Sequence, residues 1–393
     1  MPWCQDGIAR LSLTEVAQLT CDLVSIESVN PDLVTNGGGE AAIAKMVSSW
    51  LRTQNLQVEI IEPVPGRPSV VAVVRGKGGG RNLMLNAHMD TVGAGEMSNP
   101  FRPVVDSGRI YGRGAYDMKG SLAAIMVAAK EASHLDLAGD LIVTAVADEE
   151  VASLGTSAVL EQFKADAAIV AEPTELQLCT AHKGFVWLEV ETRGVAAHGS
   201  RLDIGIDAIG HMGTILALVS DLDGKLRRGA QHPMLGTGSI HASTVEGGNE
   251  LSTYPARCLA RFERRTIPGE DGSSAIAEML LEVGNARNRL PQLDAAVRMI
   301  LQRNPSEVAE ASYVASAVGL SALKVLGRRP ERIGVPYWMD MALLNEAGVP
   351  AVAFGPSGHG AHAEVEWVNI ASLELCVQTY LEAAVQICGP RLQ

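Results

Sequence analysis

Histidine and acidic residues follow several short apolar segments of this chain. His88 and Asp90 end the segment LMLNAHMD, and Glu149 and Glu150 follow the segment LIVTAVA. Imidazole and carboxylate groups bind divalent metal ions such as zinc, and a carboxylate that binds no metal can act as a general base. The residue types therefore point to metal-assisted chemistry.

Two of these positions lie on one face of a predicted strand. His88 and Asp90 are two residues apart, and strand side chains at this spacing share a face. A histidine that binds a metal commonly gives its second ring N–H to a carboxylate, and Asp90 is placed to accept it. The alternative is a structural histidine at the end of a strand.

The next acidic residues each allow two roles. Asp117 lies in GRGAYDMKG just before an apolar helix, so it either caps this helix or bridges two cations with its two oxygens. Glu149 and Glu150 are neighbours, and neighbouring strand residues point to opposite faces. We expect one of them to bind metal and the other to act as a general base, with a pKa raised by like charges and partial burial. A solvated acidic loop is the alternative for this pair.

Further candidates follow the later apolar segments. Glu172 lies in VAEPTE, and His359 and His362 lie in GPSGHGAHAEVEW. Each alone also suits a turn carboxylate or a structural histidine. Ligands of open α/β sheets bind beyond the carboxyl ends of the strands, where these side chains are expected. Together they would supply nitrogen and oxygen ligands for two divalent ions that share a carboxylate.

Continuous apolar runs of strand length predict an α/β fold with a mostly parallel sheet and helices on both faces. Between 184 and 302 apolar and polar residues alternate more, which predicts a smaller α+β domain inserted into a larger domain of 1–183 and 303–393. The predicted strands lie within 54–61, 67–76, 81–90, 140–150, 166–175 and 349–362, and within 184–194, 236–248 and 256–269 of the insertion. The predicted helices are 13–25, 39–54, 119–133, 204–222 and 272–285.

Composition excludes several classes of protein. The 393 residues are 47% hydrophobic, which excludes a disordered chain, and the formal charge of −13 disfavours nucleic acid as a partner. The glycine-rich segments lack a phosphate loop, so a nucleotide-binding protein is the least favoured class. The N-terminus MPWCQDGIARLSLTE shows no signal peptide, the six cysteines are scattered, and no apolar run approaches a membrane span. We expect a cytoplasmic protein without disulfides.

The chain resembles the M20 family of co-catalytic zinc hydrolases, which includes acetylornithine deacetylase, succinyl-diaminopimelate desuccinylase, aminoacylase and glutamate carboxypeptidase. The resemblance rests on the order of SVNPD, LNAHMDTV, GRGAYDMKG, ADEE, AEPT, AHGSR, ERRTIPGE and AHAEVEWV. It implies a catalytic domain of 1–183 and 303–393 with two divalent metal ions, zinc or alternatively cobalt or manganese. It also implies that 184–302 is a lid and dimerisation domain of a homodimer.

The resemblance also implies a role for each candidate residue. Asp117 would bridge the metals, Asp90 would orient a ligand, and Glu149 would take a proton from the attacking water and pass it to the leaving amine. His198 in AAHGS would stabilise the oxyanion, often in the partner subunit's active site. The metal ligands would be His88, Asp117, Glu150, Glu172 and His362.

Substrate contacts are implied with three departures from the family pattern. Arg265 would hold a substrate carboxylate or the lid, but Glu263 replaces the usual aspartate two residues before it. Ser252 stands where many relatives carry asparagine, and His359 stands where a small residue is typical, so that it could contact substrate. The substrate therefore should not be copied from any one relative.

The predicted function is cleavage of an amide C–N bond, with removal of the acyl group from an anionic N-acyl amino acid or a similar small acid. A dipeptidase, carboxypeptidase or aminohydrolase with the same metal centre is the nearest alternative. A binding protein with an inactive site is a remote one.

Overall fold

The computed structural model of the chain describes residues 13–390, and the N-terminal prediction for residues 1–12 lies outside this range. The described chain divides into two units. The first contains residues up to Leu178, Ala309–Arg332 and the chain from Leu343, and the second contains Cys179–Val308 and Ile333–Ala342. These ranges differ from the predicted ones because 179–183, 303–308 and 333–342 also group with the second unit. The roles of the two units stay a prediction.

The first unit is built on a mostly parallel sheet, which confirms the predicted fold class. Six of its strands follow the order β1-β2-β6-β3-β7-β17. The four from β6 to β17 are parallel, and β2 is antiparallel to both of its neighbours, β6 and the edge strand β1. The bounds are β1 Gln57–Ile61, β2 Ser69–Val74, β3 Leu83–His88, β6 Leu141–Val146, β7 Ala167–Val170 and β17 Ala351–Ala353.

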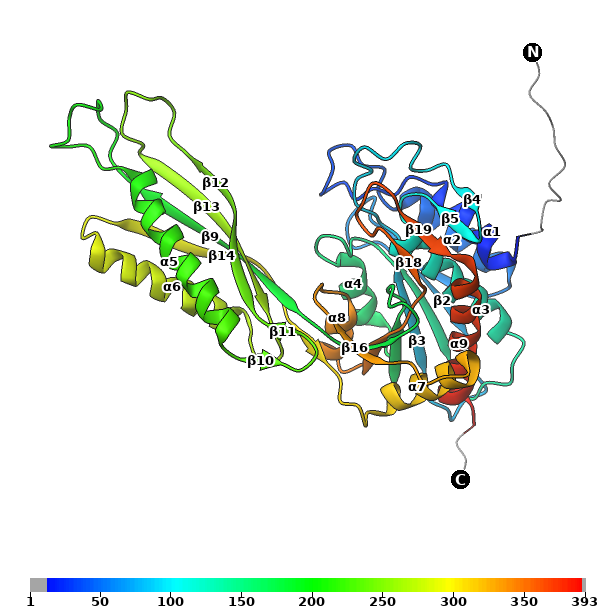
Figure 1. Ribbon diagram of the computed structural model, residues 1–393. Helices are drawn as coiled ribbons and strands as arrows, with labels where there is room; N and C mark the ends of the chain where they lie inside the picture. Colours follow the sequence, from blue (N-terminus) through cyan, green and yellow to red (C-terminus); the bar gives the residue numbers. More distant parts are fainter. Residues whose placement is uncertain (1–12, 391–393) are drawn as a thin grey trace, which may run out of the picture. The chain divides into compact units, whose positions relative to one another are not determined.

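Helices pack on this sheet because their apolar residues face it. Helices α1, α3, α7 and α9 pack together, with α3 and α9 on β3, while α2 and α4 pack on β1 and β2. Figure 1 shows α4 and α3 on opposite sides of β3. The bounds are α1 Glu15–Val24, α2 Ala41–Thr53, α3 Gly120–Ala132, α4 Leu154–Gln162, α7 Tyr313–Leu326, α8 Met341–Glu346 and α9 Ile370–Cys388.

A small antiparallel sheet of the first unit was not predicted. Its order is β18-β19-β5-β4, so the segment that follows β17 pairs with the segment that precedes Asp117. A five-residue π-helix, η1 (Ala115–Lys119), connects this sheet to α3. The strand bounds are β4 Val104–Asp106, β5 Arg109–Tyr111, β18 Gly358–His359 and β19 Trp367–Asn369.

The second unit has the predicted antiparallel strands and two helices. A sheet of order β12-β13-β9-β14 packs against α5 and α6 around a core that includes Leu188, Ile215 and Phe262. Helix α5 begins at 208, later than predicted, because the Asp207 side chain caps it at Gly210 N. Strand β14 was not predicted, since only one of its ten residues is buried. The bounds are β9 Gly184–Arg193, β12 Ser239–Gly247, β13 Arg257–Thr266, β14 Asp294–Arg303, α5 Ala208–Arg228 and α6 Gly272–Arg289.

The remaining strands are short. They are β8 Leu178–His182, β10 Gln231–His232, β11 Gly236–Thr237, β15 Ser306–Glu307 and β16 Arg332–Val335. The five cysteines between residues 13 and 390 are free, and Cys4 lies outside the described residues. No helix in that range is long and apolar enough to span a membrane.

Candidate metal centre

His88 is the last residue of β3 and is buried, as the sequence predicts for a strand end beneath a ligand site. Its Nε2 lies 3.2 Å from Asp117 Oδ1, 3.6 Å from Glu172 Oε1 and 4.0 Å from Glu149 Oε2. Three carboxylates from three separate segments therefore converge on one imidazole nitrogen.

Asp117 lies between two histidines. Its Oδ1 faces His88, and its Oδ2 lies 3.4 Å from His362 Nε2. The same His362 nitrogen lies 3.1 Å from Glu150 Oε2. Each oxygen of Asp117 thus faces a different imidazole, which is the arrangement expected of a carboxylate that bridges two cations.

The structure excludes the alternative in which Asp117 caps a helix. Lys119 is the N-cap of α3, whereas Asp117 and Met118 have non-helical dihedral angles inside η1 and are joined by a cis peptide bond. Gly114 begins this turn with a φ of 79°, where a Cβ atom would lie 2.6 Å from Thr91 Cγ2. The Gly-rich sequence is required here because a side chain at 114 would collide with the strand-end loop.

Glu149 and Glu150 do not point to opposite faces of a strand. Strand β6 ends at Val146, and both glutamates lie in the turn that follows it, so the strand geometry behind the prediction does not apply. Glu150 forms one group of neighbouring ligand atoms with His88 and Asp117, and Glu149 forms another with His88 and Glu172. Both carboxylates therefore belong to the cluster.

Asp90 holds this turn more directly than it holds His88. The His88 Nδ1 atom is 2.9 Å from the backbone oxygen of Asp90 and 3.6 Å from its carboxylate. The Asp90 carboxylate instead accepts hydrogen bonds from the backbone N–H groups of Glu149 and Glu150, at 3.1 and 3.2 Å. The predicted contact through the side chain is thus made through the backbone.

A buried charged network continues from Asp90 and was not predicted. Asn30 donates one hydrogen bond to Asp90 and one to Asp148, at 2.8 and 3.0 Å. Asp148 also pairs with Arg67 at 2.7 Å, and Arg67 pairs with Glu40 at 2.7 Å. The only sequence signal was the presence of Asn30 in the motif SVNPD. No local pattern marks Arg67.

The donor set fits divalent cations. Glu172 follows β7 and is buried, and the Glu150 side chain is only 7% exposed, with its Oε1 atom meeting no hydrogen-bond donor among the described residues. A buried carboxylate oxygen without a donor is costly unless a cation binds it. The five predicted ligands, His88, Asp117, Glu150, Glu172 and His362, therefore lie where two such ions could be bound.

The electrostatics of the cluster favour positive charge. Burial alone would lower the pKa of His88, but the hydrogen bond to Asp117 and the charge of Glu172 raise it well above its usual value. Hydrogen bonds to Asp117 and Glu150 raise the pKa of His362 to about 10. For Asp117, burial is outweighed by the hydrogen bonds of the same two histidines, and its pKa lies well below its usual range.

Two of the predicted substrate contacts are neighbours within the second unit. In the second unit, His198 forms a β-bridge with Thr253, and its Nδ1 is 2.8 Å from Ser200 Oγ. Ser252 lies beside it, with its backbone oxygen 2.6 Å from Gly199 N. The structure therefore brings His198 and Ser252 together.

Arg265 and His359 each have an aromatic neighbour. Arg265 pairs with Glu263 at 2.7 Å and lies over Phe185 in the second unit. His359 stacks on Trp367 in the first unit and does not belong to the groups of ligand atoms found among the described residues. The contacts of these two residues with substrate stay predictions.

The fold and the cluster of imidazole and carboxylate groups define a class, the metal-dependent hydrolases of amide bonds. Residues 84–386 match the model of peptidase family M20/M25/M40. The chain belongs to this family, which confirms the resemblance seen in the sequence and the expected hydrolase class.

Named relatives agree with this assignment, and a solved structure shares the fold. The chain is 31% identical to an acetylornithine deacetylase of Myxococcus xanthus over 82% of this chain and 85% of the relative. It is 26% identical to an N-formyl-4-amino-5-aminomethyl-2-methylpyrimidine deformylase of Bacillus subtilis, over 95% of each chain. A dinuclear metal-binding peptidase of the M20 family from Bacillus subtilis superposes with a TM-score of 0.74 and 17% identity, over 96% of this chain and 98% of that one.

Proposed function

We propose that the protein is an amidohydrolase that removes the acyl group from an N-acyl amino acid or a similar small carboxylic acid. The observation that carries this proposal is the position of Asp117, whose two oxygens face His88 and His362. The names of the deacetylase and deformylase relatives support acyl removal. The dinuclear peptidase supports two ions, for which we propose zinc.

The residues would divide the work as follows. Two bound divalent ions would polarise the scissile carbonyl and make a water molecule nucleophilic near neutral pH. Glu149 would take the proton of the attacking water and deliver it to the nitrogen of the breaking C–N bond. The ions would be held by the five ligands His88, Asp117, Glu150, Glu172 and His362.

The second unit would complete the site as a lid. His198 would donate a hydrogen bond to the carbonyl oxygen as negative charge develops there, from the same subunit or from a partner in a homodimer. Arg265 would bind the substrate carboxylate, with Ser252 and His359 as further substrate contacts. Because Arg265 pairs with Glu263, a bound carboxylate would have to share the guanidinium with it.

The variant Glu149→Gln tests the role of the general base. We expect kcat to fall by roughly 10²- to 10⁴-fold, while metal analysis still finds two ions per chain. Loss of one ion would show that Glu149 is a ligand, a role that its place beside His88 and Glu172 allows. Full turnover in this variant would contradict the mechanism.

A substrate panel tests the reaction. The metal-loaded protein is assayed with N-acyl amino acids, dipeptides and N-aryl amides that share one leaving amine where the chemistry allows it. The proposal expects kcat/KM to be highest for an N-acyl amino acid. A clear preference for dipeptides would instead make the protein a peptidase.

A further inference from the structure

Glu366 is a buried carboxylate that belongs to neither group of ligand atoms. Its side chain is 2% exposed and accepts hydrogen bonds at both oxygens. Oε1 accepts from the backbone N–H groups of Tyr116 and Asp117, at 2.9 and 3.0 Å. Oε2 accepts from the N–H of Gly114 at 2.9 Å and from Arg113 Nη1 at 2.8 Å. Three of its four donors are therefore backbone groups of the segment that carries Asp117.

Glu366 also lies close in the chain to the predicted metal ligand His362. Glu366 follows His362 by four residues, and Arg113, its ion-pair partner, also donates to the backbone oxygen of Ala363 at 2.9 Å. Arg113 and Glu366 thus connect the segments 113–117 and 362–366. Each of these segments supplies one imidazole or carboxylate to the cluster.

The hydrogen bonds matter because the segment 114–117 has little regular structure to hold it. Gly114 is left-handed and Asp117 has non-helical dihedral angles. Charge-assisted hydrogen bonds to a carboxylate are about twice as strong as neutral ones. Burial raises the pKa of Glu366, and the backbone N–H groups of Asp117 and Gly114 oppose that shift.

We infer that Glu366 is a positioning residue, which fixes the backbone of 114–117 so that the two oxygens of Asp117 face His88 and His362. Its carboxylate belongs to neither group of ligand atoms, and it would act through the hydrogen bonds that it accepts from the backbone of Gly114, Tyr116 and Asp117. The inference rests on the proposed function, because the geometry matters for cations held by Asp117.

The variant Glu366→Gln tests this role with little change in shape. An amide has one acceptor oxygen, and its NH₂ group would face donors at Gly114 and Arg113 or at Tyr116 and Asp117. We expect the affinity for at least one of two cobalt ions to fall 10- to 100-fold, as for other residues that orient metal ligands. Calorimetric titration of Co²⁺ into the metal-free full chain measures this affinity, and the visible absorption of bound Co²⁺ reports any change in ligand geometry.

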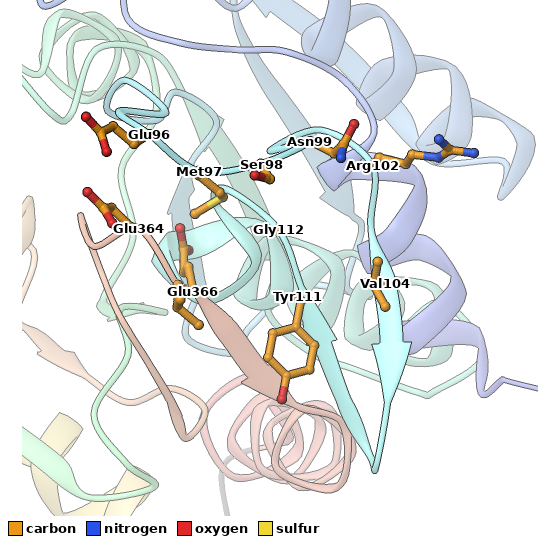
Figure 2. A pocket seen from close by; sticks show the side chains of 11 residues that line it. Glu96, Met97, Ser98, Asn99, Arg102, Val104, Tyr111, Gly112, Glu364 and Glu366 are labelled. Carbon is orange, nitrogen blue, oxygen red and sulfur yellow. The ribbon is translucent and has the colours of Figure 1, made fainter.

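The matched control is Glu364→Gln. Glu364 and Glu366 line the same cavity of about 390 Å³. Figure 2 shows both side chains, together with those of Glu96, Met97 and Tyr111. Glu364 is exposed, so the same change two residues away should leave the Co²⁺ affinity and the spectrum unchanged.

Thermal unfolding separates positioning from general stability. A residue that only stabilises the fold would lower the melting temperature of the metal-free and the metal-bound protein equally. A positioning residue would also reduce the rise in melting temperature that Co²⁺ produces. If Glu366→Gln does not fold, Glu366→Asp serves instead, because its shorter carboxylate keeps the charge but cannot reach all four donors.

The outcomes distinguish the two proposals. If the unchanged protein binds two ions and the Glu366 variants bind them with equal affinity and spectrum, the positioning role is wrong and the proposed function stands. If the unchanged protein binds no ions, the proposed function fails, and the positioning role fails with it.

Discussion

The segments 148–150 and 113–117 both bring carboxylates to the cluster, but they are held from different distances in the chain. Asp90 accepts the backbone N–H groups of Glu149 and Glu150, and it lies two residues after the ligand His88. Glu366 accepts the N–H groups of the Asp117 segment from 249 residues away. Each segment therefore donates backbone hydrogen bonds to a buried carboxylate outside the two groups of ligand atoms, Asp90 at a neighbouring strand end and Glu366 in a distant segment.

The two segments also differ in where the compensating positive charge lies. Arg113 pairs directly with Glu366 at 2.8 Å. Asp90 instead accepts from the neutral amide of Asn30, and the nearest guanidinium of that network, Arg67, pairs with Asp148 and Glu40. Arg67 therefore compensates two buried carboxylates, Glu40 and Asp148. Arg113 compensates only Glu366, which also accepts three backbone hydrogen bonds.

The variant Arg67→Met should lower the free energy of unfolding most. This change leaves the fully buried carboxylates of Glu40 and Asp148 without their cation, which costs roughly 3–5 kcal/mol of unfolding free energy. Arg113→Met should cost less, roughly 1–3 kcal/mol, because Glu366 keeps its backbone donors. Urea denaturation measures both values.

A matched control for these arginines is Lys324→Met, which removes the exposed pair with Glu382. It should change the unfolding free energy by less than about 1 kcal/mol. Equal losses of unfolding free energy in Arg67→Met and Arg113→Met would contradict the comparison, because the two buried positive charges would then be equivalent.

The variant Asp90→Asn tests whether Asp90 and Glu366 affect the Co²⁺ affinity in the same way. In Asp90→Asn, whichever way the amide turns, its NH₂ group faces a backbone N–H donor of Glu149 or Glu150. We expect a 10- to 100-fold loss of Co²⁺ affinity, similar to that of Glu366→Gln. Asp136→Asn, at an exposed surface pair with Lys77, is the control, and unchanged affinity in Asp90→Asn would mean that the two carboxylates differ in role.

The smallest loss of unfolding free energy is expected for Gly114→Ala, in the turn whose N–H groups donate to Glu366. Gly114→Ala places a Cβ atom against Thr91 at a φ of 79°, which should cost roughly 1–2 kcal/mol of unfolding free energy. The control Gly213→Ala lies in α5 with open space around the added atom, and it should stabilise the protein by roughly 0.5–1 kcal/mol. If Gly114→Ala and Gly213→Ala both raised or both lowered the melting temperature, the predicted difference between the two glycines would be wrong.

The sequence predicted the parts of the site that depend on strand ends. His88 and Glu172 follow buried apolar strands, so their meeting at one sheet edge follows from the parallel topology. The same reasoning failed for Glu149 and Glu150, because β6 ends before them and the turn obeys no strand alternation. The apolar patterns also predicted the larger and the inserted sheets, because apolar residues run continuously in the first and alternate with polar residues in the second.

The residues that sequence reasoning missed act through backbone groups or over long distances. Glu366 lies in the motif that identified His362, but nothing local shows that its partners are N–H groups near Asp117. Arg67 stands at the start of an apolar run without any periodic signal. Such contacts depend on tertiary structure, which a pattern of residue types does not encode.

The order of the ligand segments has a consequence for synthesis of the protein. A ribosome makes His88, Asp117, Glu150 and Glu172 long before His362 and Glu366, which lie near the C-terminal end of the chain. A nascent chain that stops short of residue 362 therefore lacks both one imidazole of the cluster and the carboxylate that holds the Asp117 turn. The complete set of ligands is therefore translated just before α9, which begins at Ile370, so metal loading would mark a chain translated at least through residue 366.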